Sequence, residues 1–224
     1  SKRANQQYVL FESERDKGTN VTAMYDYLLD SYANFIKVVE APDNGQYLEG
    51  AKNRLRSLYP YLLNGAVYYS EQKQPAKALD LAAAYIDMPQ LPAFSSELLP
   101  KDSRYASVVY YAAVSAYNLH KNEQALKYFR EYLNTGTEAQ EKYCYVYMNM
   151  IYQSQKKYAD QERILLKANE KYPVSLDFLY NLVNVYIATN NMEKLLGAID
   201  KILAVDPNND KVLPIKARIL ERQG

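Results

Sequence analysis

Several residue types are scarce or missing in this 224-residue chain, and each shortage excludes a class of structure or function. A single cysteine, Cys144, excludes an internal disulfide and a structural zinc site of the cysteine type. No apolar run approaches the roughly 20 residues that a helix needs to cross a bilayer. Lys and Arg (27) nearly balance Asp and Glu (26), so the basic surplus typical of nucleic-acid binders is missing. The sequence therefore predicts neither nucleic-acid binding nor a membrane-spanning segment in this chain.

Glycine is also scarce, with seven residues, and tryptophan is missing, whereas tyrosine occurs 24 times. Few glycines together with many alanine, leucine and tyrosine residues are typical of a chain that is helical throughout. Tyrosine suits the surfaces between helices, because its ring can be buried while its hydroxyl reaches water. Hydrophobic residues make up 48% and charged residues 24% of the chain, values of an ordinary globular protein. The composition therefore predicts an all-α fold.

The residues that commonly carry catalysis or bind metals are isolated from one another in this sequence. The only histidine, His120, stands beside Lys121 and Asn122 in a predicted turn, and we interpret it as a solvated turn residue. Cys144 follows Tyr143 in a predicted helix without a Cys-x-x-Cys partner, and we interpret it as a buried structural thiol. The sequence contains no nucleotide-binding glycine loop, zinc-protease motif or EF-hand spacing. We therefore expect no catalytic residue, no metal site, no cofactor and no enzymatic activity.

Apolar residues at helical spacing predict a series of short helices along the chain. The first covers residues 1–17, and the next two cover 21–39 and about 46–58, with turn residues at 42–45 between them. These last two helices are expected to form an antiparallel pair. We interpret residues 1–57 as a degenerate repeat or as capping helices at the N-terminal end.

The strongest internal pattern is a regular long-range spacing in the C-terminal half. Residues Leu179–Asn209 predict two short amphipathic helices joined by a polar turn and closed by Pro207. Pro173 precedes Pro207 by the same interval along the chain as Tyr152 precedes Tyr186. This register indicates that one kind of helix pair is repeated.

Two earlier copies are recognised at about 106–137 and about 58–89. In the copy at 58–89 the first helix fits one residue out of phase with the second, so we expect a turn that is longer by one residue near Pro75. An insert with three prolines, at 88–103, separates these copies, and its apolar side chains predict that it packs against the helices: Leu91, Phe94, Leu98 and Leu99. Small residues mark the places where helices approach closely: Gly65, Ala78, Ala113, Ala125 and Ala168.

These helix pairs resemble the tetratricopeptide repeat, a helix-turn-helix unit whose length of about 34 residues matches the interval between the paired prolines and tyrosines. The resemblance covers residues 58–207 as four repeats with the insert at 88–103, and it leaves 208–224 as a C-terminal capping helix. It implies a right-handed superhelical solenoid of antiparallel helix pairs, with about 10–11 helices in the chain. The sequence lacks the tryptophan of the family. It also lacks the Lys and Arg with which some members grip the carboxylate of a chaperone tail, so such a tail is not expected as a ligand.

The resemblance also implies a binding groove, which the family forms from the first helix of each pair at its second, fifth, ninth and twelfth positions. Tyrosine rings are rigid and amphipathic, so they provide contact area at a small entropic cost. The alternative is that these tyrosines pack on one another or on the second helices and bind nothing. The residues of this chain that we expect in the groove are Tyr69, Tyr110, Tyr117, Tyr143, Met150, Tyr180 and Asn184.

Two interpretations of function follow from these patterns. The first is a non-enzymatic protein–protein interaction module, a scaffold or adaptor that binds a peptide or a partner helix in an aromatic groove. The alternative is a ligand-sensing or glycan-capturing domain of a larger bacterial cell-envelope protein. The chain begins Ser-Lys-Arg-Ala without an initiator methionine, so we expect a fragment that lacks its N-terminus. Cytoplasmic and periplasmic locations, and any oligomeric state, stay open.

Overall fold

The structure is a computed structural model that describes residues 2–43, 45–97, 99 and 101–223. In these residues it contains eleven α-helices and no strand, which confirms the prediction of an all-α fold. The chain forms two compact units, residues 1–135 and residues 136–224. Within the described residues, no helix is both long enough and apolar enough to cross a membrane.

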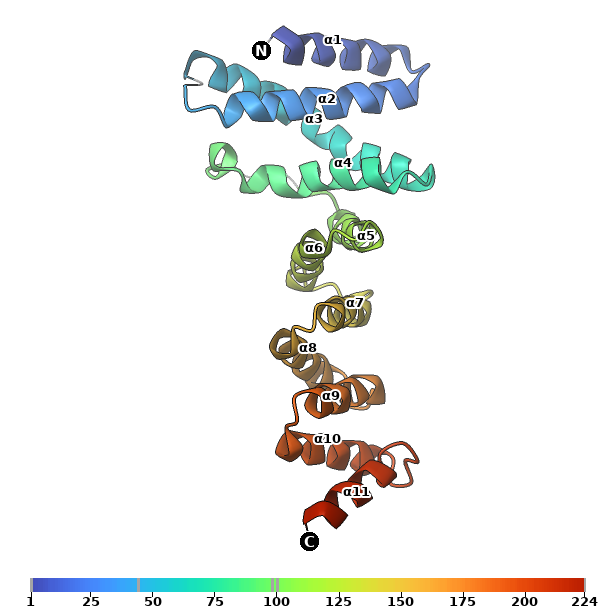
Figure 1. Cartoon of the computed structure of the whole chain (residues 1–224). Helices are drawn as coiled ribbons and strands as arrows, with labels where there is room; N and C mark the ends of the chain where they lie inside the picture. Colours follow the sequence, from blue (N-terminus) through green and yellow to red (C-terminus); the bar gives the residue numbers. More distant parts are fainter. Residues whose placement is uncertain (1, 44, 98, 100, 224) are drawn as a thin grey trace. The chain divides into compact units, whose positions relative to one another are not determined.

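The first unit contains six α-helices, and from α1 to α5 each packs on the helix that follows it. Apolar side chains at helical spacing form its core. In the second helix, for example, Tyr25, Leu28 and Phe35 are buried on one side. Figure 1 shows the first helices of this unit lying side by side. The helices are α1 (Lys2–Lys17), α2 (Val21–Val39), α3 (Gly45–Glu71), α4 (Pro75–Asp87), α5 (Tyr105–Asn118) and α6 (Asn122–Asn134).

Helix α3 corrects the predicted boundary near residue 58. It continues through Pro60 to Glu71, so the predicted end of a helix at residue 58 is wrong. A proline inside a helix removes one backbone hydrogen bond and costs about 3 kcal/mol. The ring of Pro60 is exposed, and burial of Leu58 and Leu62 on either side of it offsets this cost. Helix α2 packs on α1 as well as on α3, so α1 and α2 form the first helix pair, and α3 begins the second pair with α4.

The turns inside the later pairs have one shared geometry. Each contains a residue in the left-handed region, with φ between 53° and 57°: Lys73, His120, Lys156 and Asn190. In each turn the following amide donates to a carbonyl five residues back, as Gln74 does to Tyr69 at 2.9 Å and Asn191 does to Tyr186 at 2.9 Å. The predicted longer turn near Pro75 is therefore wrong. Tyr69, and not Tyr68, occupies the place that Tyr152 and Tyr186 hold in later pairs.

The second unit contains five α-helices. Helix α7 packs on α8, α8 on α9, and α9 on α10, while the last helix follows as a single helix against α10. The loop before this last helix is fixed by Asn209, whose Oδ1 accepts from the amides of Lys211 and Val212 at 3.2 and 3.3 Å. The helices are α7 (Glu141–Ser154), α8 (Tyr158–Lys171), α9 (Leu176–Ala188), α10 (Met192–Val205) and α11 (Leu213–Gln223).

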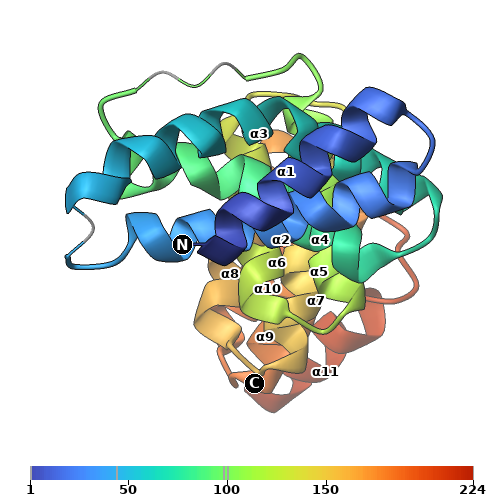
Figure 2. The same ribbon diagram turned by 90° about the horizontal axis from the view of Figure 1, so that it is seen from above.

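The insert between α4 and α5 packs against α3, as predicted (Figure 2). It contains two short 3-10 turns, Met88–Gln90 and Pro92–Phe94, and the ring of Phe94 is fully buried. Glu97 fixes the insert to α3, because its carboxylate accepts from Arg56 twice at 2.7 Å and pairs with Lys52 at 2.7 Å. Leu98, named in the prediction, lies outside the described residues.

The composition predicts that buried tyrosine rings place their hydroxyls in water. In the structure several of these hydroxyls instead donate to a carboxylate on a neighbouring helix. Tyr105 of α5 donates to Glu131 of α6 at 2.7 Å, and Tyr186 of α9 donates to Glu162 of α8 at 2.9 Å. Tyr128 donates in the same way to Asp87, at 3.3 Å. The buried rings therefore pack while their hydroxyls hold the neighbouring helix in place.

Candidate functional site

The expected groove residues of the first unit differ greatly in exposure. Tyr69 is fully buried, its hydroxyl donates to Asp26, and its ring lies 4.9 Å from the ammonium of Lys77. It therefore belongs to the core of this unit and offers no surface to a ligand. Tyr69 is buried because the residues of α3 that reach the surface lie one position later than the repeat pattern predicts. Val67 and Ser70 are at the surface where Ala66 and Tyr69 were expected.

Tyr110 and Tyr117 of α5 are both half-buried. The ring of Tyr110 packs 5.6 Å from Tyr132 and 5.9 Å from Tyr111 between centroids. Tyr111 is 61% exposed and was not among the predicted site residues. The repeat pattern assigns the groove to Tyr110 and not to the next residue, so the pattern alone could not predict that Tyr111 is the exposed ring.

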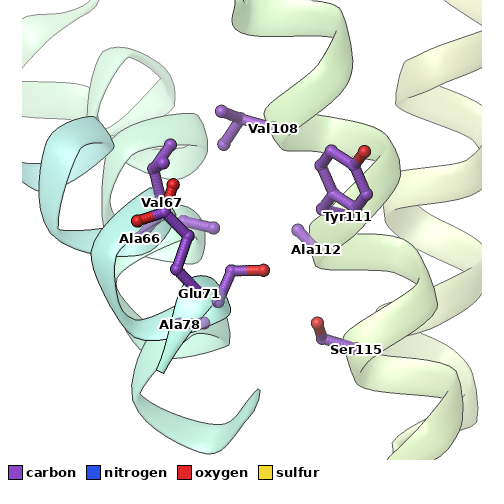
Figure 3. Close-up of a pocket in the computed structure, with 10 residues that line it drawn as sticks. Ala66, Val67, Glu71, Ala78, Val108, Tyr111, Ala112 and Ser115 are labelled. Atoms are coloured by element: carbon purple, nitrogen blue, oxygen red, sulfur yellow. The ribbon is translucent and has the colours of Figure 1, made fainter. Parts of the chain in front are cut away.

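A pocket of about 310 Å³ lies between α3, α4 and α5 (Figure 3). Its volume falls at the lower end of the range for ligand sites, about 300–1,000 Å³. Alanine side chains give it space, since larger residues at the same places would fill it. Figure 3 shows Tyr111 and Ser115 on one side, facing Val67 and Glu71 across the opening. The lining residues are Ala66, Val67, Ser70, Glu71, Ala78, Ala82, Val108, Tyr111, Ala112 and Ser115.

Glu71 is the single carboxylate in the lining of this pocket, and the lining contains no lysine, arginine or histidine. It is the last residue of α3 and is exposed. In the described part of the chain no ion pair or side-chain hydrogen bond engages its carboxylate. The pocket thus combines an apolar interior with one available negative charge at its edge.

A second pocket, of about 240 Å³, lies further back along α3. At its edge Arg104 donates to both carboxylate oxygens of Asp102, at 2.9 and 3.0 Å, and to Oδ1 of Asn64 at 3.1 Å. The bonds from Arg104 lower the pKa of Asp102 to about 2. Lys101 lies with its ammonium 4.1 Å from the ring of Tyr105. The lining residues are Tyr59, Pro60, Leu63, Asn64, Tyr85, Lys101, Asp102 and Arg104.

In the second unit the expected site residues lie on α7 and α9, which are neighbours because Asn149 donates to Asn181 across them at 3.3 Å. Tyr143 is 57% exposed and Met150 is 43% exposed, and their spacing of two helical turns places both on one face of α7.

On α9, Asn184 is exposed, beside Ile187 at 49%. Tyr180 is half-buried, and its hydroxyl accepts from Asn209 at 2.6 Å while the ammonium of Lys211 lies 5.1 Å from its ring. Tyr143, Met150 and Asn184 therefore offer free surface in this unit, whereas Tyr180 holds the C-terminal loop.

The two residues that sequence reasoning tested for chemistry lie in unreactive surroundings. Cys144 is fully buried, and burial raises the pKa of its thiol to about 12, so a thiolate does not form near neutral pH. His120 is exposed in its turn, with φ of 57°. Among the described residues, no group of three or more His, Cys, Asp or Glu side chains is placed to hold a metal ion.

The repeated helix pairs, their shared turn and the adjacency of α3 to α5 and of α7 to α9 define a tetratricopeptide-like helical-repeat fold. Neither a protein-family model nor a curated protein matches the sequence.

Three solved structures illustrate the likeness in fold. The crystal structure of MamA is 13% identical, with 90% of this chain and 97% of that chain covered and a TM-score of 0.47. That of YrrB, a tetratricopeptide repeat protein with an unusual peptide-binding site, is 13% identical over 92% of this chain and 96% of that one, with a TM-score of 0.45. A tetratricopeptide repeat protein from Parabacteroides merdae is 14% identical over 91% and 80%, with a TM-score of 0.36. At these values none of the three indicates what this chain binds.

Proposed function

We propose that this chain is a non-enzymatic protein-interaction module whose first unit binds a segment of a partner protein between α3 and α5. The observation that supports this function most directly is the apolar pocket of about 310 Å³ with Tyr111 exposed at its edge. A buried apolar anchor and an exposed aromatic ring are the features that dominate binding energy at protein interfaces. Tyr143 and Met150 give the second unit an apolar contact surface of its own.

The alanines of the pocket explain why a side chain, and not a large cofactor, is the expected occupant. Ala66, Ala82 and Ala112 are nearly fully buried, so they close the floor of the pocket between the three helices and leave a small apolar space of about 310 Å³. One or two apolar side chains of a partner helix or peptide fill such a space. The edge is then covered by Tyr111, which can pack along the bound segment.

Site-specific photo-crosslinking in the whole chain tests this function. A benzophenone amino acid at Tyr111 should crosslink a defined partner protein from the cells of origin. The same group at Tyr47, an equally exposed tyrosine on α3 (62% against 61%), should not crosslink that partner.

Two substitutions give the quantitative part of the test. Tyr111→Ala should lower capture of the partner at least about tenfold, the loss expected at an interface hot spot, while Tyr47→Ala should not. Ser115→Phe should also lower capture, because the ring fills the pocket from α5. Equal capture by all of these variants would show that the groove between α3 and α5 is not the binding surface.

A further inference from the structure

The pockets of about 310 and 240 Å³ described above follow one another along a single face of α3. The residues that α3 contributes to them are neighbouring pairs that recur every three or four positions: Tyr59 and Pro60, Leu63 and Asn64, Ala66 and Val67, Ser70 and Glu71. Helix α5 lies beside this face, because Arg104 at its start bonds to Asn64 and Ser115 in its last turn lines the first pocket. Because they adjoin along α3, we treat the two pockets together as one groove beside α5.

The two ends of this groove carry opposite charge. Lys101, Arg104 and Asp102 stand at one end, two cations against one carboxylate. Arg104 is engaged by Asp102, whereas the ammonium of Lys101 rests on an aromatic ring and pairs with no carboxylate among the described residues. At the other end Glu71 leaves a carboxylate without a partner in the described part of the chain. Between the ends the lining is uncharged.

The length of the groove limits what can connect these charges. Asn64 and Glu71 are two helical turns apart in α3, and a rise of ~1.5 Å per residue separates them by about 10 Å along the helix. Two turns of a bound helix, or a short extended peptide at about 3.3–3.6 Å per residue, cover the same distance.

We infer that the groove between α3 and α5 selects a segment of a partner protein that carries an acidic residue, an apolar residue and a basic residue in that order along the groove. The acidic side chain pairs with Lys101, the apolar one enters the alanine-lined pocket, and the basic one pairs with Glu71. This inference rests on the proposed function and adds to it the chemistry of the partner. The direction of the bound backbone is not specified, because the charges are carried by side chains.

Three synthetic helical peptides test the inference, each with a central leucine and charged residues about one turn before and after it. One has an acidic and a basic residue, one has two acidic residues, and one has two basic residues. Binding to the whole chain is measured by fluorescence anisotropy at low ionic strength, where exposed ion pairs are least screened. The mixed peptide should bind about three- to fivefold more tightly than either of the others, in keeping with exposed ion pairs.

Charge reversal in the protein should exchange these preferences. Glu71→Lys should make the peptide with two acidic residues the best ligand, and Lys101→Glu should favour the peptide with two basic residues. Glu49→Lys and Lys37→Glu change the net charge equally at exposed sites outside the groove, and they should leave the order unchanged.

The possible failures are distinguishable. If the three peptides bind equally and the groove reversals change nothing while Ser115→Phe weakens all three, the charge selectivity is wrong and the proposed binding groove stands. The selectivity is also wrong if Glu49→Lys shifts preference as much as Glu71→Lys. If Ser115→Phe leaves every peptide bound as before, the groove itself is wrong and both proposals are overturned.

Discussion

Gln161 of α8 donates a hydrogen bond from Nε2 to Oδ1 of Asn149 on α7, at 2.9 Å and away from water. In the pair α5–α6 the equivalent places hold Ala113 and Ala125, both fully buried. The equivalence is fixed by the turns, since Gln161 and Ala125 each follow the left-handed turn residue by five positions. One helix pair is therefore joined by a buried amide contact where another uses two small apolar residues.

This amide contact predicts a strong coupling between two substitutions. Gln161→Ala alone leaves the Asn149 side chain buried without its donor, and it should lower the free energy of unfolding by about 1–3 kcal/mol. Asn149→Ala should have a similar effect. The double variant reproduces the alanine pair of α5–α6 and should cost clearly less than the sum of the two single changes. Urea unfolding of the four proteins measures this coupling, and simple additivity would contradict it.

Gly65 predicts a second stability effect. A Cβ atom there would lie 2.8 Å from Cδ1 of Tyr25 and 2.9 Å from Cδ1 of Leu81. Gly65→Ala should overpack this contact at about 1–3 kcal/mol, which exceeds the gain of up to ~1 kcal/mol in helix propensity. Thermal unfolding should therefore show a lower midpoint for the variant.

Gly50, in the same helix, is the matched control. A Cβ atom there would meet no other atom within 4 Å. Gly50→Ala should therefore raise stability by about 0.5–1 kcal/mol, through helix propensity alone. Equal effects at the two glycines would mean that the close approach to α2 and α4 does not limit packing at Gly65.

Most helices, and the later pairs α5–α6 and α9–α10, could be predicted because apolar spacing and turn residues are local signals. The first pair could not, since the predicted pair of 21–39 with 46–58 left out α1, which packs on α2. The tight-contact places Ala113 and Ala125 were also recognisable as small residues in register. In the copy that begins with α3, however, the turn at Lys73 makes Ala66, and not Gly65, the equivalent of Ala113. The end of α3 was missed because Pro60 normally terminates a helix, whereas here tertiary burial on both sides overrides that local cost.

The candidate site was predicted less well, for two physical reasons. An error of one residue moves a helical side chain by about 100°, and this turned the buried Tyr69 into an expected groove residue. The pocket itself is made by alanines of three helices, and no single stretch of sequence contains it. The opposite charges of Lys101 and Glu71, at the two ends of the groove, could not be paired from the sequence either, because the insert brings Lys101 next to α3 and α5 only in the folded chain.

Glu97 predicts an acid-dependent loss of stability. Hydrogen bonds from Arg56 and then Lys52 lower the pKa of Glu97 to about 2, from the usual value of 4.5. Because the folded-state pKa is the lower one, the ion pair stabilises the fold above about pH 4.5, and this contribution is lost as the pH falls towards 2. Urea unfolding between neutral and acidic pH measures the loss.

Glu97→Gln should remove this part of the acid dependence. It should also loosen the insert, so that trypsin cleaves after Lys101 or Arg104 faster in the folded variant than in the wild type. Glu49→Gln serves as the control, because Glu49 is largely exposed and lies 3.7 Å from Lys52. Equal cleavage rates for wild type and Glu97→Gln would show that Glu97 does not hold the insert.

The tyrosine–carboxylate contacts predict a loss of stability at alkaline pH. Burial, and then the hydrogen bond to Glu131, raises the pKa of Tyr105 above its usual value of 10.0. The pKa values of Tyr69 and Tyr186 are shifted in the same direction, first by burial and then by their bonds to Asp26 and Glu162. Since the folded-state pKa is the higher one, these contributions are complete below about pH 10 and are lost as the pH rises further.

Tyrosinate absorbance and helical circular dichroism, followed together in an alkaline titration, measure this effect. The buried tyrosines should ionise only as the helices unfold, so the late part of the absorbance change should coincide with the loss of helicity. Tyr105→Phe removes one such hydroxyl and should raise the alkaline midpoint, while costing about 0.5–1.5 kcal/mol at neutral pH for the lost hydrogen bond. Tyr47→Phe, at an exposed ring, should change neither quantity. Complete tyrosine ionisation with intact helices would contradict the prediction, because it would mean that the hydroxyls reach water without opening the contacts between helices.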